Sequence, residues 1–410
     1  MPPTESPLTT RRHTLRTPRA FPAFVTLLAL LLAACSTVPL RGTGDLGVVI
    51  ERTTGQAQIV DTTRDRVLAQ ISGLGDLSHA TVVFSRDQRY AYVFARDGAL
   101  TKIDLLRARI VARVMQAKNS IGGAISQDGR FIAAANYYPG GVNIFRADTL
   151  APVAHMATRG PNGKPSRVVG LVSAPGDRFV FSLFDAGEIW LVDLAHAGGT
   201  AEPRIMKFRD VGREPYDGVL TPDGRYYLAG LFGEDGMALL DLWHPKAGVR
   251  RILEGYGKGR RRLPVYKMPH LEGWAFIGRY AFVPAVGHHE VLVVDTGRWR
   301  LAGRIPVAGQ PVFVVGQPYS GRVWVNFAFP HNDRVQVIDG VRRRVIATLH
   351  PGKGIMYMEF TPRGTQVWMS ARDSDRVVIY DTASLRRIAS FRSTRPSGIF
   401  FTSRAYKLGW

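Results

Sequence analysis

A sequence pattern that recurs along almost the whole chain limits the possible folds more than any other feature. Each copy has a β-rich run, a tight turn, and two further β-rich runs, of which the last usually ends in Asp. Pro, Asp and Gly in the turns provide the backbone dihedrals that a tight hairpin needs. The turns are Ser85–Asp87, Ser126–Gly129, Pro175–Asp177, Thr221–Gly224, Ile277-Gly278, Pro318–Gly321 and Thr361–Gly364. The runs that end in Asp stop at Asp61, Asp104, Asp193, Asp241, Asp295, Asp339 and Asp381, and Asn143–Phe145 fills the gap in this series.

These signals define eight units of roughly 47 residues, with strand patterns and no long helical pattern, which is the period of β-propeller blades. The run Leu46–Asp61 lacks the first part of a unit, and Ser397–Thr402 lacks the last part. Together they complete one blade, which closes the ring and removes the free sheet edges. We therefore predict an all-β, eight-bladed β-propeller over residues 46–410, in which the N- and C-terminal strands share the closing blade.

The first 35 residues have the features of an export signal. Four arginines precede the apolar run Phe21–Ala34, which is too short to span a bilayer comfortably. The run ends in Leu32-Ala33-Ala34-Cys35, which resembles a bacterial lipobox, and Cys35 is the only cysteine of the chain. The sequence predicts a lipoprotein signal peptide over residues 1–35, acylation of Cys35, and a tether over residues 36–45.

The export signal also indicates where the protein resides. The stretch Thr10–Arg16 resembles a twin-arginine signal, although Thr14 stands where Phe is usual, so the Sec and twin-arginine routes both stay open. Either route leads beyond the cytoplasmic membrane. Ser36 follows Cys35, at the position where Asp would retain a lipoprotein at the inner membrane. We expect a lipid-anchored periplasmic protein at the outer membrane.

The chain is strongly basic, with a net charge of +21 from 54 Lys and Arg against 33 Asp and Glu. The leader holds only four Arg and one Glu, so the charge belongs mainly to the propeller. An excess of cations favours an anionic partner, and export argues against nucleic acid. A single cysteine excludes disulfide scaffolds and thiolate metal clusters, and a c-type haem is excluded because no Cys-x-x-Cys-His occurs.

Propeller topology predicts which polar residues share one face. Residues just before an innermost strand and residues at the tips of the second hairpin of a blade lie at the same mouth of the channel. The first group holds His79, Arg167, Tyr216, Asp217, His270 and Tyr357, and the hairpin tips hold Arg52, Arg96, Asn136, Tyr137, His288, His289, His331 and Arg372. Arginine offers a planar fork for carboxylates, histidine can ligate a metal, and tyrosine can stack or donate a hydrogen bond. A flat, polycarboxylated metallo-macrocycle suits such a mouth.

Several segments resemble the haem d1 domain of the cytochrome cd1 nitrite reductase family. They are His79–Ser85, Arg89–Gly98, Ile103–Leu105, Ala135–Pro139, Ser166–Val169 and Glu188–Asp193. The resemblance covers essentially the whole chain behind the leader, and the family's domain is an eight-bladed propeller, in agreement with the repeat. Nitrite reductase carries an additional c-type cytochrome domain. Because this sequence has no such motif, the resemblance implies a family member that acts in haem d1 biosynthesis.

The resemblance also implies roles for individual residues. His79, at the start of the innermost strand of the first complete blade, matches the axial ligand of the haem iron. Arg52, Arg96 and Arg167 match positions that hold the carboxylates of the cofactor, which is haem d1 or an iron tetrapyrrole precursor of it. Asn136, Tyr137 and Arg372, which share the predicted mouth, complete the predicted cofactor-binding set. Tyr216-Asp217 stands where the reductase has a distal His followed by Asp, which puts nitrite reduction in doubt. Together with His270, these two residues form the candidate catalytic group.

The implied function is a late step of haem d1 assembly, on a precursor such as dihydro-haem d1. The step is either a modification of the tetrapyrrole, such as an oxidation, or delivery of the product, with cytochrome cd1 nitrite reductase and its maturation proteins as partners. Two other classes stay open. One is a propeller hydrolase or lactonase, which needs a carboxylate and Asn calcium site that an Arg- and His-rich mouth disfavours. The other is a non-catalytic outer-membrane scaffold.

Overall fold

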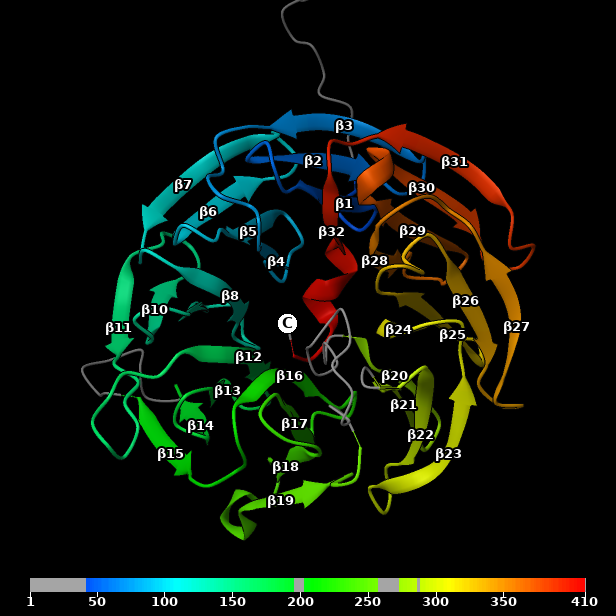
Figure 1. The fold of residues 1–410 in the computed structure, drawn as a ribbon. Helices are drawn as coiled ribbons and strands as arrows, with labels where there is room; N and C mark the ends of the chain where they lie inside the picture. Colours follow the sequence, from blue (N-terminus) through cyan, green and yellow to red (C-terminus); the bar gives the residue numbers. More distant parts are fainter. Residues whose placement is uncertain (1–41, 195–202, 257–272, 286–287, 410) are drawn as a thin grey trace, which may run out of the picture. The chain divides into compact units, whose positions relative to one another are not determined.

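The computed structural model describes residues 42–194, 203–256, 273–285 and 288–409. These residues form eight four-stranded antiparallel sheets, arranged as the blades of a ring (Figure 1). The prediction of an all-β, eight-bladed propeller is confirmed. The predicted signal peptide and Cys35 lie outside the described residues, and so does His270. Within the described part, no helix is both long and apolar enough to cross a membrane.

The four strands of each blade are called A to D here, from the centre of the ring to its edge (Figure 1). The A strands are β4 (Thr81–Phe84), β8 (Ser120–Ile125), β12 (Val168–Ala174), β16 (Pro215–Leu220), β20 (Ala275–Ile277), β24 (Pro311–Gly316), β28 (Ile355–Phe360) and β32 (Pro396–Phe401). The B strands are β1 (Leu46–Glu51), β5 (Tyr90–Phe94), β9 (Phe131–Asn136), β13 (Arg178–Leu183), β17 (Tyr226–Leu231), β21 (Tyr280–Ala285), β25 (Arg322–Phe327) and β29 (Gln366–Ala371).

The outer half of each blade follows the same order. The C strands are β2 (Gln56–Asp61), β6 (Ala99–Asp104), β10 (Val142–Arg146), β14 (Glu188–Asp193), β18 (Met237–Asp241), β22 (Glu290–Asp295), β26 (Val335–Asp339) and β30 (Arg376–Asp381). The D strands are β3 (Arg66–Ile71), β7 (Arg109–Met115), β11 (Pro152–Met156), β15 (Arg204–Phe208), β19 (Val249–Ile252), β23 (Arg300–Pro306), β27 (Arg344–Leu349) and β31 (Arg387–Arg392). Short 3-10 helices are η1 (Pro245–Ala247), η3 (Arg372–Ser374) and η4 (Thr402–Tyr406).

The two ends of the chain build one blade between them. In blade 1, β32 from the C-terminal end pairs with β1, so that Val48 lies opposite Phe400, and β1 continues into β2 and β3. Blades 2 to 8 then follow in chain order, from β4–β7 to β28–β31. The predicted sharing of the closing blade is confirmed by the strand order β3-β2-β1-β32 of this sheet.

The hydrophobic core is divided among the contacts between blades. One cluster of buried side chains fills each of the eight interfaces between neighbouring sheets. Between blades 2 and 3, for example, Tyr92 and Phe94 pack with Ile132. Inner strands are therefore covered on both faces, whereas β7 alternates between exposed and half-buried residues, as expected for a strand at the rim.

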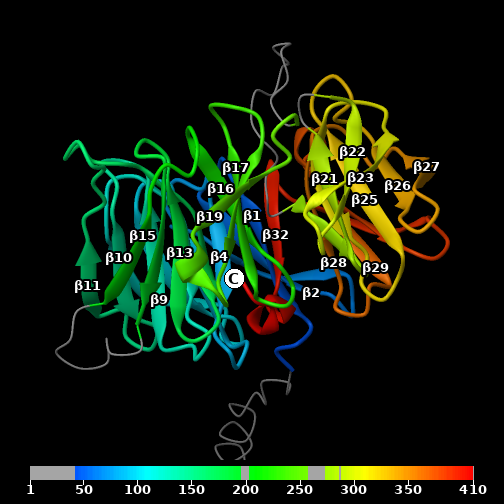
Figure 2. The ribbon, with the colours of Figure 1, turned by 90° about the horizontal axis from the view of Figure 1, so that it is seen from below.

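The two faces of the ring differ. The A–B and C–D turns lie on one face, called the turn face, where the backbone N–H of Leu242 donates to the carbonyl of Arg225 at 2.7 Å. The B–C loops and the connections between blades form the opposite mouth face. The C-terminal segment with η4 crosses the ring axis at the turn face (Figures 1 and 2). Arg86 holds this segment by donating to the carbonyl of Ala405, and Gln88 donates to that of Thr402 at 3.0 Å.

Candidate functional site

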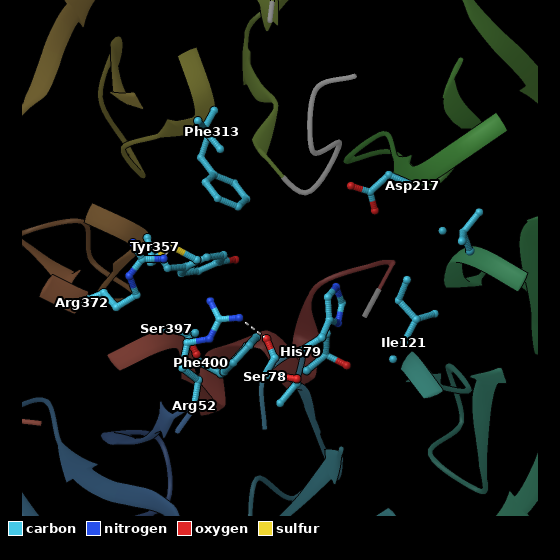
Figure 3. A pocket seen from close by; sticks show the side chains of 18 of the residues that line it. Arg52, Ser78, His79, Ile121, Asp217, Phe313, Tyr357, Arg372, Ser397 and Phe400 are labelled. Atoms are coloured by element: carbon cyan, nitrogen blue, oxygen red, sulfur yellow. Dashed lines mark hydrogen bonds between the residues drawn. The ribbon is translucent and has the colours of Figure 1, made fainter. Parts of the chain in front are cut away.

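A cavity of about 660 Å³ occupies the channel and extends to the loops of the mouth face. This volume lies within the range of roughly 300–1,000 Å³ that is typical of small-molecule sites. The wall comes mainly from the A strands of blades 1 to 5, 7 and 8. Figure 3 shows His79, Asp217 and Phe313 pointing into the cavity from different blades.

β-Bulges explain how inner strands deliver these side chains. In six A strands the pairing with strand B shifts register, at β8, β12, β16, β24, β28 and β32. A bulge leaves one or two residues without a ladder partner and redirects their side chains. The residues at these irregularities that line the cavity are Ile121, Gly170, Leu171, Asp217, Gly218, Val312, Phe313, Met356, Tyr357, Ser397 and Gly398.

Buried polar groups hold the bulges in place. The N–H of Phe313 donates to Oδ1 of Asn326 at 2.8 Å, and the N–H of Tyr357 donates to Oγ of Ser370 at 2.9 Å. Gly170 has φ +60°, and a Cβ there would lie 2.1 Å from the carbonyl oxygen of Asp217 in the next blade. At β24 and β28 a backbone N–H that has no ladder partner is therefore held by a buried side chain, which fixes this part of the wall in place.

Arg52 and Arg372 place two guanidinium groups at the mouth of the cavity. Arg372 donates to Asp373, through Nε to Oδ1 at 2.9 Å and Nη2 to Oδ2 at 3.0 Å, and these bonds raise the pKa of Arg372. Arg395 shares this carboxylate, with Nη1 2.8 Å from Oδ1. Arg52 donates to the carbonyl of Ser78 at 2.6 Å and forms no ion pair with a described carboxylate. Burial, followed by the charges of Arg372 and Arg395, lowers the pKa of Arg52. An anionic ligand beside Arg52 would relieve this repulsion.

His79 presents its imidazole to the cavity from blade 2 (Figure 3). The predicted position at the start of the strand was wrong by two residues, because β4 begins at Thr81 and His79 lies in the preceding turn. Among the residues that the structure describes, no group of three or more His, Cys, Asp or Glu is placed to hold a metal ion. An iron that is already held by a macrocycle needs only axial ligands, and one imidazole can provide such a ligand.

An aromatic cluster supports the wall near blades 4 and 5. Tyr216 lines the cavity, with its ring centre 5.9 Å from that of Phe184 and 5.7 Å from that of Phe232. Burial raises the pKa of Tyr216, and the charge of Asp217 adds to this effect. Tyr216 therefore stays a neutral hydrogen-bonding group across the physiological pH range.

The other predicted cofactor-binding residues lie beside the cavity lining. The guanidinium groups of Arg96 and Arg167 flank the ring of Tyr137, at 5.0 and 5.2 Å from its centre. Arg167 also binds Asp185, through Nε to Oδ2 at 3.0 Å, which raises its pKa. Asn136 is buried, and its side-chain amide exchanges hydrogen bonds with that of Gln116 at 3.0 and 3.2 Å. Of the predicted cofactor-binding residues, Arg52, His79 and Arg372 therefore line the cavity. Arg96, Asn136, Tyr137 and Arg167 lie next to it.

A buried ion pair, which the sequence reasoning missed, supports Tyr357 from behind. Arg404 of η4 donates from Nη2 to Oε2 of Glu359 and to Oη of Tyr357, both at 2.6 Å. Arg404 and Glu359 are 2% and 5% exposed. One sequence signal points to this pair: Glu359 is the carboxylate in the otherwise apolar run Ile355–Phe360. A carboxylate that is buried in such a strand needs a charged or hydrogen-bonding partner.

Comparison with known proteins connects this chain to one family. A model of the family described as "Cytochrome D1 heme domain" matches residues 41–405. Protein NirF of Pseudomonas aeruginosa is 60% identical over 93% of this chain and 98% of its own length. Protein NirF of Stutzerimonas stutzeri is 57% identical over 92% of this chain and 97% of its own length.

A solved structure extends the likeness to three dimensions. The dihydro-heme d1 dehydrogenase NirN, in complex with DHE, matches with a TM-score of 0.77 and 26% identity. The match covers 90% of this chain and 77% of that chain. With a family match across the whole propeller and relatives above 55% identity, the chain belongs to the cytochrome D1 heme domain family.

Proposed function

We propose that this chain binds haem d1 or a late precursor, such as dihydro-haem d1, in the channel cavity during haem d1 biosynthesis. It acts there in the final modification of the tetrapyrrole or in its delivery to cytochrome cd1 nitrite reductase. The observation that carries this proposal is the combination of one imidazole and two guanidinium groups at a preformed cavity. The NirN relative, which is a dihydro-heme d1 dehydrogenase solved with DHE, supports the same ligand class.

The residues at the cavity fit such a ligand. The half-buried Arg52 lacks a carboxylate partner among the described residues and would gain one from a propionate or acetate group of the macrocycle. Phe313, Tyr357 and Phe400 offer aromatic surface to a flat ring. A bound iron tetrapyrrole would supply the metal and the conjugated ring. His79 would provide a nitrogen ligand to the iron, Arg52 and Arg372 would hold carboxylates, and the wall would shield the ring from water.

Spectroscopic titration tests this proposal directly. Haem d1 and dihydro-haem d1 are each added to the purified chain, and we expect a saturable shift of the absorption bands at one ligand per chain. The loaded protein is then mixed with apo nitrite reductase, with and without an electron acceptor. Transfer with an unchanged precursor spectrum indicates delivery, whereas conversion that depends on the acceptor indicates modification. A spectrum identical to that of free ligand at all protein concentrations would contradict the proposal and favour the scaffold alternative.

Arg52 is expected to dominate recognition of the ligand's carboxylates. Removal of one partner of a desolvated charge pair costs about 2–5 kcal/mol, so Arg52→Ala should weaken binding of haem d1 at least about tenfold. Arg167→Ala should have a smaller effect, because Asp185 already neutralises that guanidinium. The fully esterified macrocycle is the control, since it should bind to native chain and Arg52→Ala alike. Equal affinity of the two proteins for the free acid would contradict this role of Arg52.

We also propose that acylation of Cys35 anchors the protein in the periplasm, at the outer membrane. Cys35→Ala should move the protein from the membrane fraction to the soluble periplasmic fraction, as measured after a wash at high salt. Ser36→Asp is the matched variant, and it should keep the anchor but shift the protein to the inner membrane. If Cys35→Ala stays with salt-washed membranes, another element is the anchor.

A further inference from the structure

The turn face, on the opposite side of the ring from the mouth, has a charge pattern that tetrapyrrole binding does not explain. In blades 6 to 8, the A–B and C–D turns contain six arginines and no Asp or Glu. We call this set the basic arc; it consists of Arg279, Arg298, Arg342, Arg343, Arg363 and Arg386. Three carboxylates border these turns at the ends of the C strands: Asp295 pairs with Arg279, Asp339 pairs with Arg342 at 3.1 Å, and Asp381 accepts from Ser384. Arg298, Arg363 and Arg386 are exposed and form no ion pair with a described residue.

Large apolar side chains project from the same face. Tyr319, in the A–B turn of blade 7, is 94% exposed, and Val341, in the C–D turn of the same blade, is 76% exposed. Trp243, in the C–D turn of blade 5, is 56% exposed. Aromatic rings beside cations are typical of proteins that rest at a membrane–water interface, where the ring reaches the acyl boundary and the cation stays among the phosphates.

The polypeptide enters the propeller at this face as well. The hydroxyl of Thr43 donates to the carbonyl of Asp87 in the A–B turn of blade 2, at 3.2 Å. The hydroxyl of Thr402 donates to the carbonyl of Thr43 at 2.7 Å. The segment that carries Cys35 therefore joins the ring on the turn face, only a few residues before Thr43. An anchor in that segment would keep the turn face near the lipid surface.

From these three observations we propose that the turn face is a docking surface for an anionic membrane. The arginines of the basic arc bind lipid phosphate groups, and Tyr319 and Val341 insert at the level of the headgroups. The mouth of the cavity then points away from the membrane, toward soluble partners. The inference does not depend on the identity of the tetrapyrrole. Charge alone would also fit a nucleic acid, but the exposed apolar tips and the site of chain entry favour a lipid surface.

Vesicle binding tests the basic arc. The full chain with Cys35→Ala, which has no lipid anchor, is sedimented with phosphatidylglycerol–phosphatidylcholine vesicles and with pure phosphatidylcholine vesicles. We expect binding to the anionic vesicles that decreases with salt. Because a cation near such a surface contributes about 1 kcal/mol, Arg298→Gln/Arg363→Gln/Arg386→Gln should reduce partitioning at least about tenfold. The matched control is Lys118→Gln/Arg159→Gln/Lys164→Gln, which removes three exposed cations from the mouth side and should change partitioning little.

Site-specific labelling tests the orientation independently. With Cys35 replaced, Tyr319→Cys and Tyr138→Cys each introduce a unique thiol for an environment-sensitive dye. Tyr138 is 72% exposed in a B–C loop of the mouth face. Vesicles should shift the dye emission at position 319 and leave that at position 138 unchanged. Three results would overturn the proposal: an equal loss of vesicle binding in the two triple variants, equal binding to both vesicle types, or an emission shift at position 138 alone. Binding of an RNA oligonucleotide without vesicle binding would assign the arc to another polyanion and would overturn it too.

Discussion

The His79→Ala variant is expected to fold like the native chain but to lose the absorption bands of the ligated iron tetrapyrrole. His79 lies in an exposed turn, so its removal costs the core little. Its imidazole faces the cavity from blade 2 and is the nitrogen ligand that we propose for the iron. The variant should also fail to support haem d1 production in a cell that lacks the native gene. Absorption spectroscopy of the loaded protein and complementation measure the two effects.

Two controls separate ligation from a general disturbance of the site. Added imidazole should restore the bands of His79→Ala, because it can occupy the space of the lost side chain. His244→Ala, which alters an exposed histidine of the turn face, should leave both bands and complementation unchanged. Native bands together with full complementation in His79→Ala would refute the ligand assignment and direct attention to His270.

Of the variants proposed here, Arg404→Met is expected to cause the largest loss of stability. Loss of one partner of a buried ion pair typically costs about 3–5 kcal/mol, because the other charge stays buried alone. In Arg404→Met, Glu359 would be left in this state, and Tyr357 would lose the donor at its hydroxyl. We expect a clear decrease in the midpoint of thermal unfolding, together with weaker tetrapyrrole binding, because Tyr357 lines the cavity.

A double variant distinguishes the buried charge from lost packing. Arg404→Met/Glu359→Leu removes both charges and should recover much of the lost stability. Arg146→Ala breaks an ion pair with Asp148 in which both side chains are at least half exposed, and it should leave the midpoint of thermal unfolding almost unchanged. A double variant as unstable as Arg404→Met would show that shape, and not the unpaired carboxylate, determines the effect.

The ring could be predicted from sequence because its signals are local. The A–B turns of blades 2 to 8 each contain Pro, Asp or Gly, which favour tight turns, and the B and C strands follow within a few residues. The incomplete units at Leu46–Asp61 and Ser397–Thr402 then allowed only one way to close the sheet. Because these features depend only on residues that are close in the chain, they can be recognised in a single sequence.

The candidate site could be predicted less completely from the sequence, because it depends on contacts between residues that are distant in the chain. The bulge that exposes Phe313 depends on Asn326 of the next strand, and nothing near Phe313 marks it as a wall residue. Arg96 and Arg167 match a carboxylate-binding pattern, yet in the structure both guanidinium groups pack against the ring of Tyr137. Arg404 lies 45 residues from Glu359 and meets it only because η4 returns to the ring axis.

The closing blade makes the cavity dependent on the completion of synthesis. β32 supplies Ser397, Gly398 and Phe400 to the wall, and η4 supplies Arg404 behind Tyr357. These residues follow all other blades in the chain, so a ribosome must finish translating the propeller before the binding surface exists. A chain that ends before β32 would therefore lose both the strand that closes the ring and part of the cavity wall.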